Sequence, residues 1–79
     1  MTVFLRAGGN LRAMIAPDVD HYTRKLEIDG GKTIGEILQH ISLSPAFVAL
    51  MYVDGAMKDL SYKPADGETI TLQPPVSGG

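Results

Sequence analysis

The chain has 79 residues, no cysteine, and a formal charge of −2 from seven Lys/Arg and nine Asp/Glu. A chain of this length forms one domain that buries only about 60% of its unfolded surface, which leaves little room for a deep, water-excluding active site. The lack of cysteine excludes a disulfide framework, a thiolate zinc site and a cysteine nucleophile, and the mixed charges provide no basic stretch that could follow a nucleic-acid backbone.

The first half of the chain contains two predicted strands. An apolar run followed by turn residues at positions 8–10 indicates a strand over residues 2–7. A second strand is predicted over residues 23–28, because Leu26 and Ile28 fall on one face and charged residues fall on the other.

The segment between these strands has a helical spacing of apolar residues at Leu11, Met14 and Ile15. Asn10 is the expected N-cap of this segment, and Pro17 is its expected stop. We therefore expect one or two helical turns within a loop.

A capping box at Thr33 and Glu36 predicts the start of the main helix. In this motif the side chain of each residue can accept a hydrogen bond from the backbone N–H of the other. Apolar residues then recur at i, i+3, i+4 and i+7, which places them on one stripe: Ile34, Ile37, Leu38 and Ile41. A helix this short does not hold alone, so its apolar stripe is expected to lie on the neighbouring strands.

The second half of the chain reads as three strands. Residues 44–45 break the helix, and the apolar run of residues 47–53 predicts a strand that is buried on both sides. Asp54-Gly55 is a two-residue hairpin signal that leads into a short strand at residues 56–58. Alternating residues 69–72 predict the last strand.

The resulting order is strand, strand, helix, strand, short strand, strand. This is an α+β arrangement with the order of the β-grasp fold, a mixed sheet with one main helix packed on one face. We assign residues 1–73 to this domain and residues 74–79 to an extended, flexible C-terminal tail that ends in Gly-Gly.

The longest apolar run, residues 46–53, is far shorter than the roughly 20 residues that span a bilayer. The N-terminus, Met-Thr-Val-Phe-Leu-Arg, lacks the features of a signal peptide. We therefore expect a cytoplasmic protein without a membrane partner.

The tail is the most distinctive segment. Pro74 and Pro75 cannot donate hydrogen bonds to a strand ladder, so they direct the chain out of the sheet. Six extended residues reach at most about 20 Å. Because glycine has no Cβ, Gly78 and Gly79 can enter a narrow channel in another protein and present a carboxylate there.

Several motifs occur together in family order: residues 31–38 at the helix start, Val53-Asp54-Gly55, Asp66-Gly67-Glu68, and the ending Pro74-Pro75-Val76-Ser77-Gly78-Gly79. This set resembles the ubiquitin-like sulfur-carrier proteins, the family of the small molybdopterin synthase subunit and the thiamin-pathway carrier. The double proline is most similar to the molybdopterin-type members. Those members often have a large apolar residue before the prolines, where this chain has Gln73.

The resemblance implies a carrier and not an enzyme: an E1-like adenylating enzyme uses ATP to join the Gly79 carboxylate to AMP. A persulfide donor then converts Gly79 to a thiocarboxylate, and a synthase takes the sulfur into its product. Gly79 is thus the implied covalent site, and the partner-binding tail consists of Pro74, Pro75, Val76, Ser77 and Gly78. The resemblance implies no catalytic residue, bound cofactor or metal in this chain.

Alternatives remain at this point. The product is expected to be molybdopterin, with thiamin thiazole or another thiolated metabolite as alternatives. The same activated carboxylate could be captured by a lysine amine, as in a ubiquitin-like protein modifier. A third reading is a non-covalent β-grasp binding module.

Two further clusters contain residue types that occur in binding sites. Val48, Leu50 and Tyr52 alternate together and could form the apolar centre of a docking face, or they could be ordinary core. A loop with Asp18, Asp20 and His21 carries metal-ligating residue types, but no second His or Cys lies nearby, so a solvated loop is expected.

Overall fold

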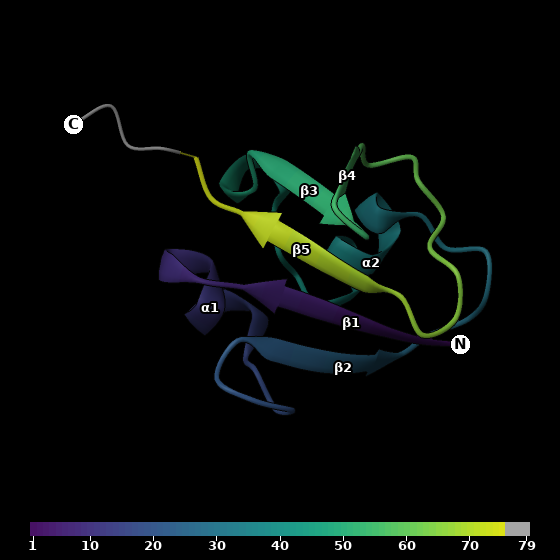
Figure 1. The fold of residues 1–79 in the computed structure, drawn as a ribbon, viewed down its shortest axis with the longest axis horizontal. Helices are drawn as coiled ribbons and strands as arrows, with labels where there is room; N and C mark the ends of the chain where they lie inside the picture. Colours follow the sequence, from purple (N-terminus) through teal and green to yellow (C-terminus); the bar gives the residue numbers. More distant parts are fainter. Residues whose placement is uncertain (76–79) are drawn as a thin grey trace.

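The computed structural model describes residues 1–75 of the chain. Its elements follow the predicted order: β1 (Thr2–Ala7), α1 (Gly9–Ile15), β2 (Thr23–Glu27), α2 (Ile34–His40), the 3-10 turn η1 (Pro45–Phe47), β3 (Leu50–Val53), β4 (Ala56–Lys58) and β5 (Thr69–Gln73). In the described chain the strands form one five-stranded sheet in the order β2-β1-β5-β3-β4, with α2 behind it (Figure 1). The predicted α+β architecture, a mixed sheet with the main helix on one face, is confirmed.

The centre of the sheet is the parallel pair β1–β5, in which Phe4 lies opposite Thr69 and Ala7 lies opposite Leu72. The other strand pairs are antiparallel. Because parallel strands run in the same direction, the ends of β1 and β5 meet at one edge of the sheet, where α1 also lies (Figure 1).

The core lies between one face of the sheet and the helices. The predicted stripe of α2 faces it, with Ile34, Ile37 and Leu38 buried and Ile41 partly buried against the same cluster. The strands contribute the alternate residues that the pleat directs to this face: Val3, Leu5, Ala7, Leu26, Met51, Val53, Ile70 and Leu72.

The capping box at the start of α2 is present as predicted. The Glu36 amide donates to the Thr33 Oγ1 at 3.1 Å, and the Thr33 amide donates to the Glu36 Oε1 at 3.0 Å. The hydrogen bond from the Thr33 backbone is the main reason why the pKa of Glu36 is lowered. Two N–H groups that the helix leaves without internal partners are therefore satisfied by side chains.

The predicted cap of α1 is wrong. Asn10 lies inside the helix, and Gly8 is the N-cap, without a side-chain hydrogen bond. Gly9 has φ +57° as the first helical residue, a conformation that glycine adopts without the steric cost a Cβ would add. Of the predicted helical residues, Leu11 and Ile15 are buried, whereas Met14 is 42% exposed.

The predicted strand over residues 47–53 is also wrong at its start and in its burial. Pro45 begins the 3-10 turn, whose N-cap Ser44 accepts a hydrogen bond from the Ala46 amide at 3.2 Å, so residues 45–47 are not available to the sheet. β3 begins only at Leu50, and its residues alternate between exposed and buried because α2 covers one face of the sheet. The Asp54-Gly55 hairpin is confirmed, with the positive φ of +52° and +77° that a type I′ turn requires.

We predict that Thr33→Ala lowers the free energy of unfolding by about 1 kcal/mol, because it removes the hydroxyl that accepts the Glu36 amide. Thr33→Ser keeps the hydroxyl and is expected to stay close to the parent protein. Urea denaturation of the three proteins measures this difference. Equal loss of stability in both variants would contradict a role for the hydroxyl.

We predict that Glu36→Gln reduces the stability of the protein at neutral pH but not at low pH. The folded-state pKa of Glu36 is lowered by the Thr33 hydrogen bonds, so its charged form stabilises the fold above the unfolded-state pKa. This contribution disappears as the pH falls through the lower folded-state pKa. Urea denaturation from neutral pH to about pH 3 is expected to show the two proteins converging on acidification, and a constant difference would contradict the mechanism.

Candidate functional site

The candidate site lies where β5 ends and the chain leaves the sheet. The Gln73 carbonyl accepts a hydrogen bond from the Ala49 amide at 2.8 Å, which holds the last residue of β5 against the segment that precedes β3. Pro74 is half-buried and Pro75 is exposed. Pro74 has no N–H with which to continue a ladder, so the backbone pairing of β5 ends at this point.

Pro74 packs next to the start of α1. A Cβ added to Gly9 would lie 3.9 Å from the Pro74 Cγ, which is an ordinary van der Waals distance. The Pro74 ring therefore lies about one side-chain carbon away from Gly9. The remaining residues predicted for the tail, Val76, Ser77, Gly78 and Gly79, lie outside the described residues, and their assigned roles stay predictions.

An open groove of ≈ 410 Å³ lies beside Pro74 on the β1 side of the exit. Its walls come from the end of β1, the start of α1, the loop before β2 and the end of β5. The lining residues are Arg6, Ala7, Gly8, Gly9, Tyr22, Thr71, Leu72, Gln73 and Pro74. The ends of β1 and β5 are far apart in sequence but line the same groove, because both strands end at the same edge of the sheet.

The sheet face opposite α2 carries exposed apolar side chains on the β3–β4 side of the exit. Leu50 is 37% exposed and Met57 is 63% exposed, and Tyr52, which pairs with Met57 in the ladder, is half-buried. Phe47 of the preceding 3-10 turn is 50% exposed. We call Leu50, Tyr52 and Met57 the apolar patch.

The structure separates the three residues that we predicted as one cluster. Leu50 and Tyr52 belong to the open face, whereas Val48 precedes β3 and packs against the core. Sequence reasoning missed Met57, whose ladder position opposite Tyr52 follows from the hairpin register.

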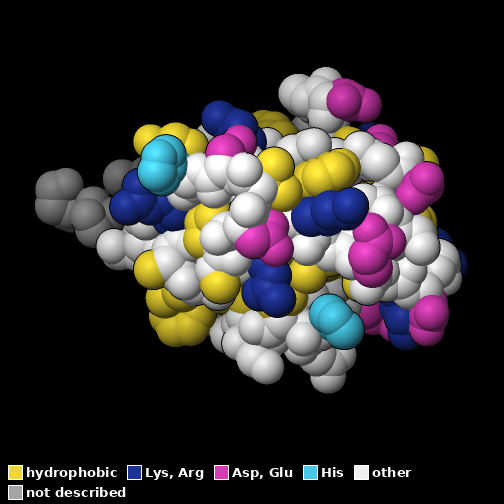
Figure 2. Space-filling model, turned by 90° about the horizontal axis from the view of Figure 1, so that it is seen from below, with side chains coloured by type: hydrophobic (Ala, Val, Ile, Leu, Met, Phe, Trp, Pro, Cys, Tyr) yellow, Lys and Arg dark blue, Asp and Glu magenta, His cyan; other side chains and the backbone are white. Residues whose placement is uncertain are grey.

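The molecule has no single-sign charged face on the side seen in Figure 2. Viewed from the β2 edge, basic and acidic side chains are interspersed, with hydrophobic surface between them (Figure 2). The ion pairs of residues 1–75 join Lys25 to Glu27 and Lys32 to Glu36. A long phosphate backbone would find no continuous basic track on this side.

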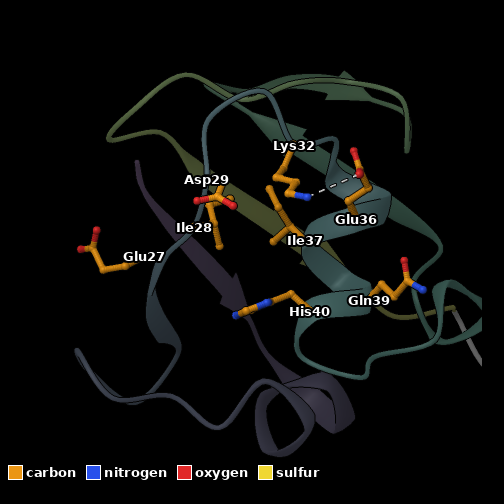
Figure 3. A pocket seen from close by; sticks show the side chains of 8 residues that line it. All are labelled: Glu27, Ile28, Asp29, Lys32, Glu36, Ile37, Gln39 and His40. Atoms are coloured by element: carbon orange, nitrogen blue, oxygen red, sulfur yellow. Dashed lines mark ion pairs between the residues drawn. The ribbon is translucent and has the colours of Figure 1, made fainter.

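A second open groove of ≈ 400 Å³ lies between α2 and the end of β2, lined by Glu27, Ile28, Asp29, Lys32, Glu36, Ile37, Gln39 and His40 (Figure 3). Lys32 points to Glu36, at 3.9 Å. Glu27 points away from the groove in Figure 3 and accepts the Thr2 hydroxyl hydrogen bond. This groove therefore does not bring a nucleophile to a base, and we assign no chemistry to it.

In the loop that carries Asp18, Asp20 and His21, both carboxylates accept hydrogen bonds from nearby backbone amides. Asp18 accepts the Lys25 amide at 2.9 Å, and Asp20 accepts the Tyr22 amide at 2.8 Å. The latter hydrogen bond is the main cause of the lowered pKa of Asp20. Residues 1–75 contain no group of three His, Cys, Asp or Glu that could hold a metal ion, and no helix among them is long and apolar enough to cross a membrane.

Comparison with known proteins returns matches only among solved structures. No protein-family model matches the chain, and no curated protein matches it. SAMP1 from Haloferax volcanii aligns over 100% of both chains, with 22% identity and a TM-score of 0.73. A Pyrococcus furiosus protein, assigned as subunit 1 of the molybdopterin converting factor, aligns over 95% of this chain and 98% of its own, with 15% identity and a TM-score of 0.70.

A third match comes from the complex of subunits 1 and 2 of the molybdopterin-converting factor of Helicobacter pylori, with 24% identity, 100% coverage of both chains and a TM-score of 0.59. The chain has the β-grasp fold. At these identities the likeness establishes the fold, and function rests on the site.

We predict that the adjacent substitutions Leu50→Lys and Met51→Lys differ sharply in their effect on stability. Leu50 is on the open face, whereas Met51 is 8% exposed and faces the core. Leu50→Lys is expected to change the free energy of unfolding by less than about 0.5 kcal/mol, and Met51→Lys is expected to lower it by about 3 kcal/mol or more, since it buries an unpaired charge. Chemical denaturation checks this pair, and equal losses would show that the patch is covered.

Proposed function

We propose that this chain is a ubiquitin-like sulfur carrier that acts through the carboxylate of Gly79. The observation that carries the proposal is the exit at Gln73-Pro74, where β5 stops pairing and the sequence continues as Pro75-Val76-Ser77-Gly78-Gly79. The same fold occurs in proteins named as subunit 1 of the molybdopterin converting factor. Together, the fold and the tail support a carrier whose last residue is loaded and unloaded by other proteins.

The chemistry requires activation because a carboxylate is a poor electrophile. In the proposed cycle an adenylating enzyme uses ATP to form an acyl-adenylate at Gly79 and releases pyrophosphate. The terminal sulfur of a persulfide displaces AMP, and a thiol cleaves the resulting S–S bond to leave a thiocarboxylate. The thiocarboxylate sulfur then bonds to the product precursor as a thioester, and water cleaves the acyl C–S bond, which leaves the sulfur on the product and returns the carboxylate. Molybdopterin is the proposed product.

The carrier's own contribution is recognition and delivery. Gly78 and Gly79 lack side chains that would obstruct a narrow channel, and Val76 and Ser77 are the proposed channel contacts. Pro74 and Pro75 set the direction of the exit. The apolar patch beside the exit supplies a surface on which the adenylating enzyme and the synthase large subunit could each dock, because exposed apolar patches with polar surroundings mark interaction sites.

A second candidate function is conjugation of the activated Gly79 to lysine amines. It is favoured by the match to a small archaeal modifier protein from Haloferax volcanii, with a TM-score of 0.71. Activation is common to both functions, and only the acceptor differs. An amide to a lysine of another protein replaces the thiocarboxylate in this case.

We predict that intact-mass measurement of the protein from its native cells detects a form in which one oxygen is replaced by sulfur, localised to Gly79. Deletion of Gly79 is expected to abolish this form, whereas Lys63→Gln, a change in an exposed loop residue, is expected to retain it. The measured mass also establishes whether Gly79 is the last residue of the working protein.

The result distinguishes the candidates. Peptides in which Gly79 is joined to a lysine side chain would favour the modifier function. No modified form in cells, and none after incubation with an adenylating enzyme, ATP and a persulfide donor, would contradict both covalent functions and leave a binding module.

A further inference from the structure

Two arginines lie against one aromatic ring beside the tail exit. The guanidinium carbon of Arg6 is 5.8 Å from the centroid of the Tyr22 ring, and that of Arg12 is 5.7 Å from the same centroid. Arg6 comes from the end of β1, Arg12 from α1, and Tyr22 from the loop before β2. All three are exposed, and we call them the arginine clamp.

The backbone of Tyr22, whose ring is the centre of the clamp, is held by two hydrogen bonds. The Tyr22 carbonyl accepts the Ala7 amide at 2.9 Å, and the Tyr22 amide donates to Asp20 at 2.8 Å. Guanidinium groups stack favourably on an aromatic face. Stacking on the Tyr22 ring therefore restricts both arginines, which reduces the entropy that a ligand must remove when it binds them.

The clamp carries two positive charges, and Asp20 is the acidic residue near them: it interacts electrostatically with Arg6 and lines an open groove together with Arg12. The ion pairs of the described chain involve lysines, so neither Arg6 nor Arg12 is paired with a carboxylate of residues 1–75. Arg24 differs, because its guanidinium donates to the Ile15 carbonyl at 3.1 Å and supports the end of α1. Asp20 supplies one negative charge for the two guanidinium groups, so a second anion at the clamp would reduce the repulsion that remains between them.

The position of the clamp links it to the tail. Arg6 and Tyr22 line the groove that Gln73 and Pro74 also line. In the sheet, Arg6 lies opposite Thr71 of β5, and Thr71 lies opposite Tyr52 of the apolar patch. The exit of β5 therefore has a basic border on the β1 side and an apolar border on the β3 side.

We propose that the arginine clamp binds side-chain carboxylates of an acidic segment on the protein that receives the tail. This inference rests on the proposed function, since it assigns the chemistry of the partner surface at the same exit. A guanidinium presents its N–H groups as a planar fork that fits a carboxylate through two hydrogen bonds. The chain as a whole has a formal charge of −2, so local attraction at the clamp would orient an acidic partner towards the exit.

A direct binding measurement tests the chemistry without any enzyme. The ¹⁵N-labelled full chain is titrated with N-acetyl-tetraglutamate amide at low salt, and the NMR signals of Arg6, Arg12 and Tyr22 are followed. We expect these signals to shift together, and Arg6→Gln/Arg12→Gln to lose the shifts with its thermal unfolding unchanged. Lys32→Gln/Lys63→Gln, which removes the same charge elsewhere, is the matched control and is expected to keep them.

Two results of this titration would overturn the inference. One is an equal response of the parent and the Arg6→Gln/Arg12→Gln variant. The other is a response of the clamp to inorganic phosphate without a response to tetraglutamate, which would assign the clamp to phosphate groups instead.

A kinetic measurement tests the location. With the adenylating enzyme from the same cells, Arg6→Gln/Arg12→Gln is expected to raise the KM for the carrier about tenfold and leave kcat unchanged, because the clamp acts in docking and not in the chemical step. Arg6→Lys/Arg12→Lys keeps the charges but loses the fork, so an intermediate KM is expected. Added salt is expected to reduce the difference between parent and variant.

The two proposals fail in different ways. Activation of Gly79 with a parent-like KM in the Arg6→Gln/Arg12→Gln variant would overturn the clamp and leave the carrier function. Specific binding of tetraglutamate without any activation of Gly79 would support the clamp's chemistry and overturn the carrier function.

Discussion

The parallel pairing of β1 with β5 is the constraint on which the rest of the structure depends. It joins residues 2–7 to residues 69–73, and a parallel pair cannot be closed by a tight turn. The chain between these strands has to cross over the sheet, and α2 lies in this connection. The pairing also brings the ends of both strands to one edge. Residues that follow β1 and residues that follow β5 therefore become neighbours, although more than half the chain separates them.

The size of the chain determines how the two faces of the sheet differ. Its helical residues cover one face, where Val3, Leu5, Ile70 and Leu72 pack with α2. The opposite face has no second layer in the described chain, so its alternate side chains remain accessible. Because β5 lies between β1 and β3, the exit of the tail runs between an arginine on one side and apolar residues on the other. The open face is thus basic on one side of β5 and apolar on the other, and a partner with one acidic and one apolar region would fit it in one orientation.

Much of the fold was predictable because its signals are local. The Thr33–Glu36 capping box and the Asp54-Gly55 turn depend on residues within four positions of each other, and both are present. The cap of α1 was not predictable from Asn10, because the turn at Gly8-Gly9 starts the helix earlier through a positive φ. The strand before Val53 was predicted too long, although the Ser44-Pro45 pair is a signal for the 3-10 turn that replaces its first residues.

The candidate site was predictable only in part. The prolines and glycines of the tail are adjacent in sequence, so their pattern was visible. The arginine clamp was not, because Arg6, Arg12 and Tyr22 belong to three different elements and only the tertiary fold brings them to one ring. The apolar patch lies between these cases. The alternation of β3 indicated Leu50 and Tyr52, but Met57 required the hairpin register.

The place of β5 in the sheet has a consequence for how the protein is made. β5 is the last strand of the described chain to be synthesised, yet it lies between β1 and β3. The β3–β4 hairpin can form early because its contacts are local, whereas the sheet cannot join into one unit until residues 69–73 are present. Until then β1 and β3 each have an open edge, and open edges of this kind are prone to pair with other chains. A nascent chain that stops before β5 therefore contains two pairs of strands, β2–β1 and β3–β4, that are not hydrogen-bonded to each other. The sheet is completed only when the residues directly before the tail have been synthesised.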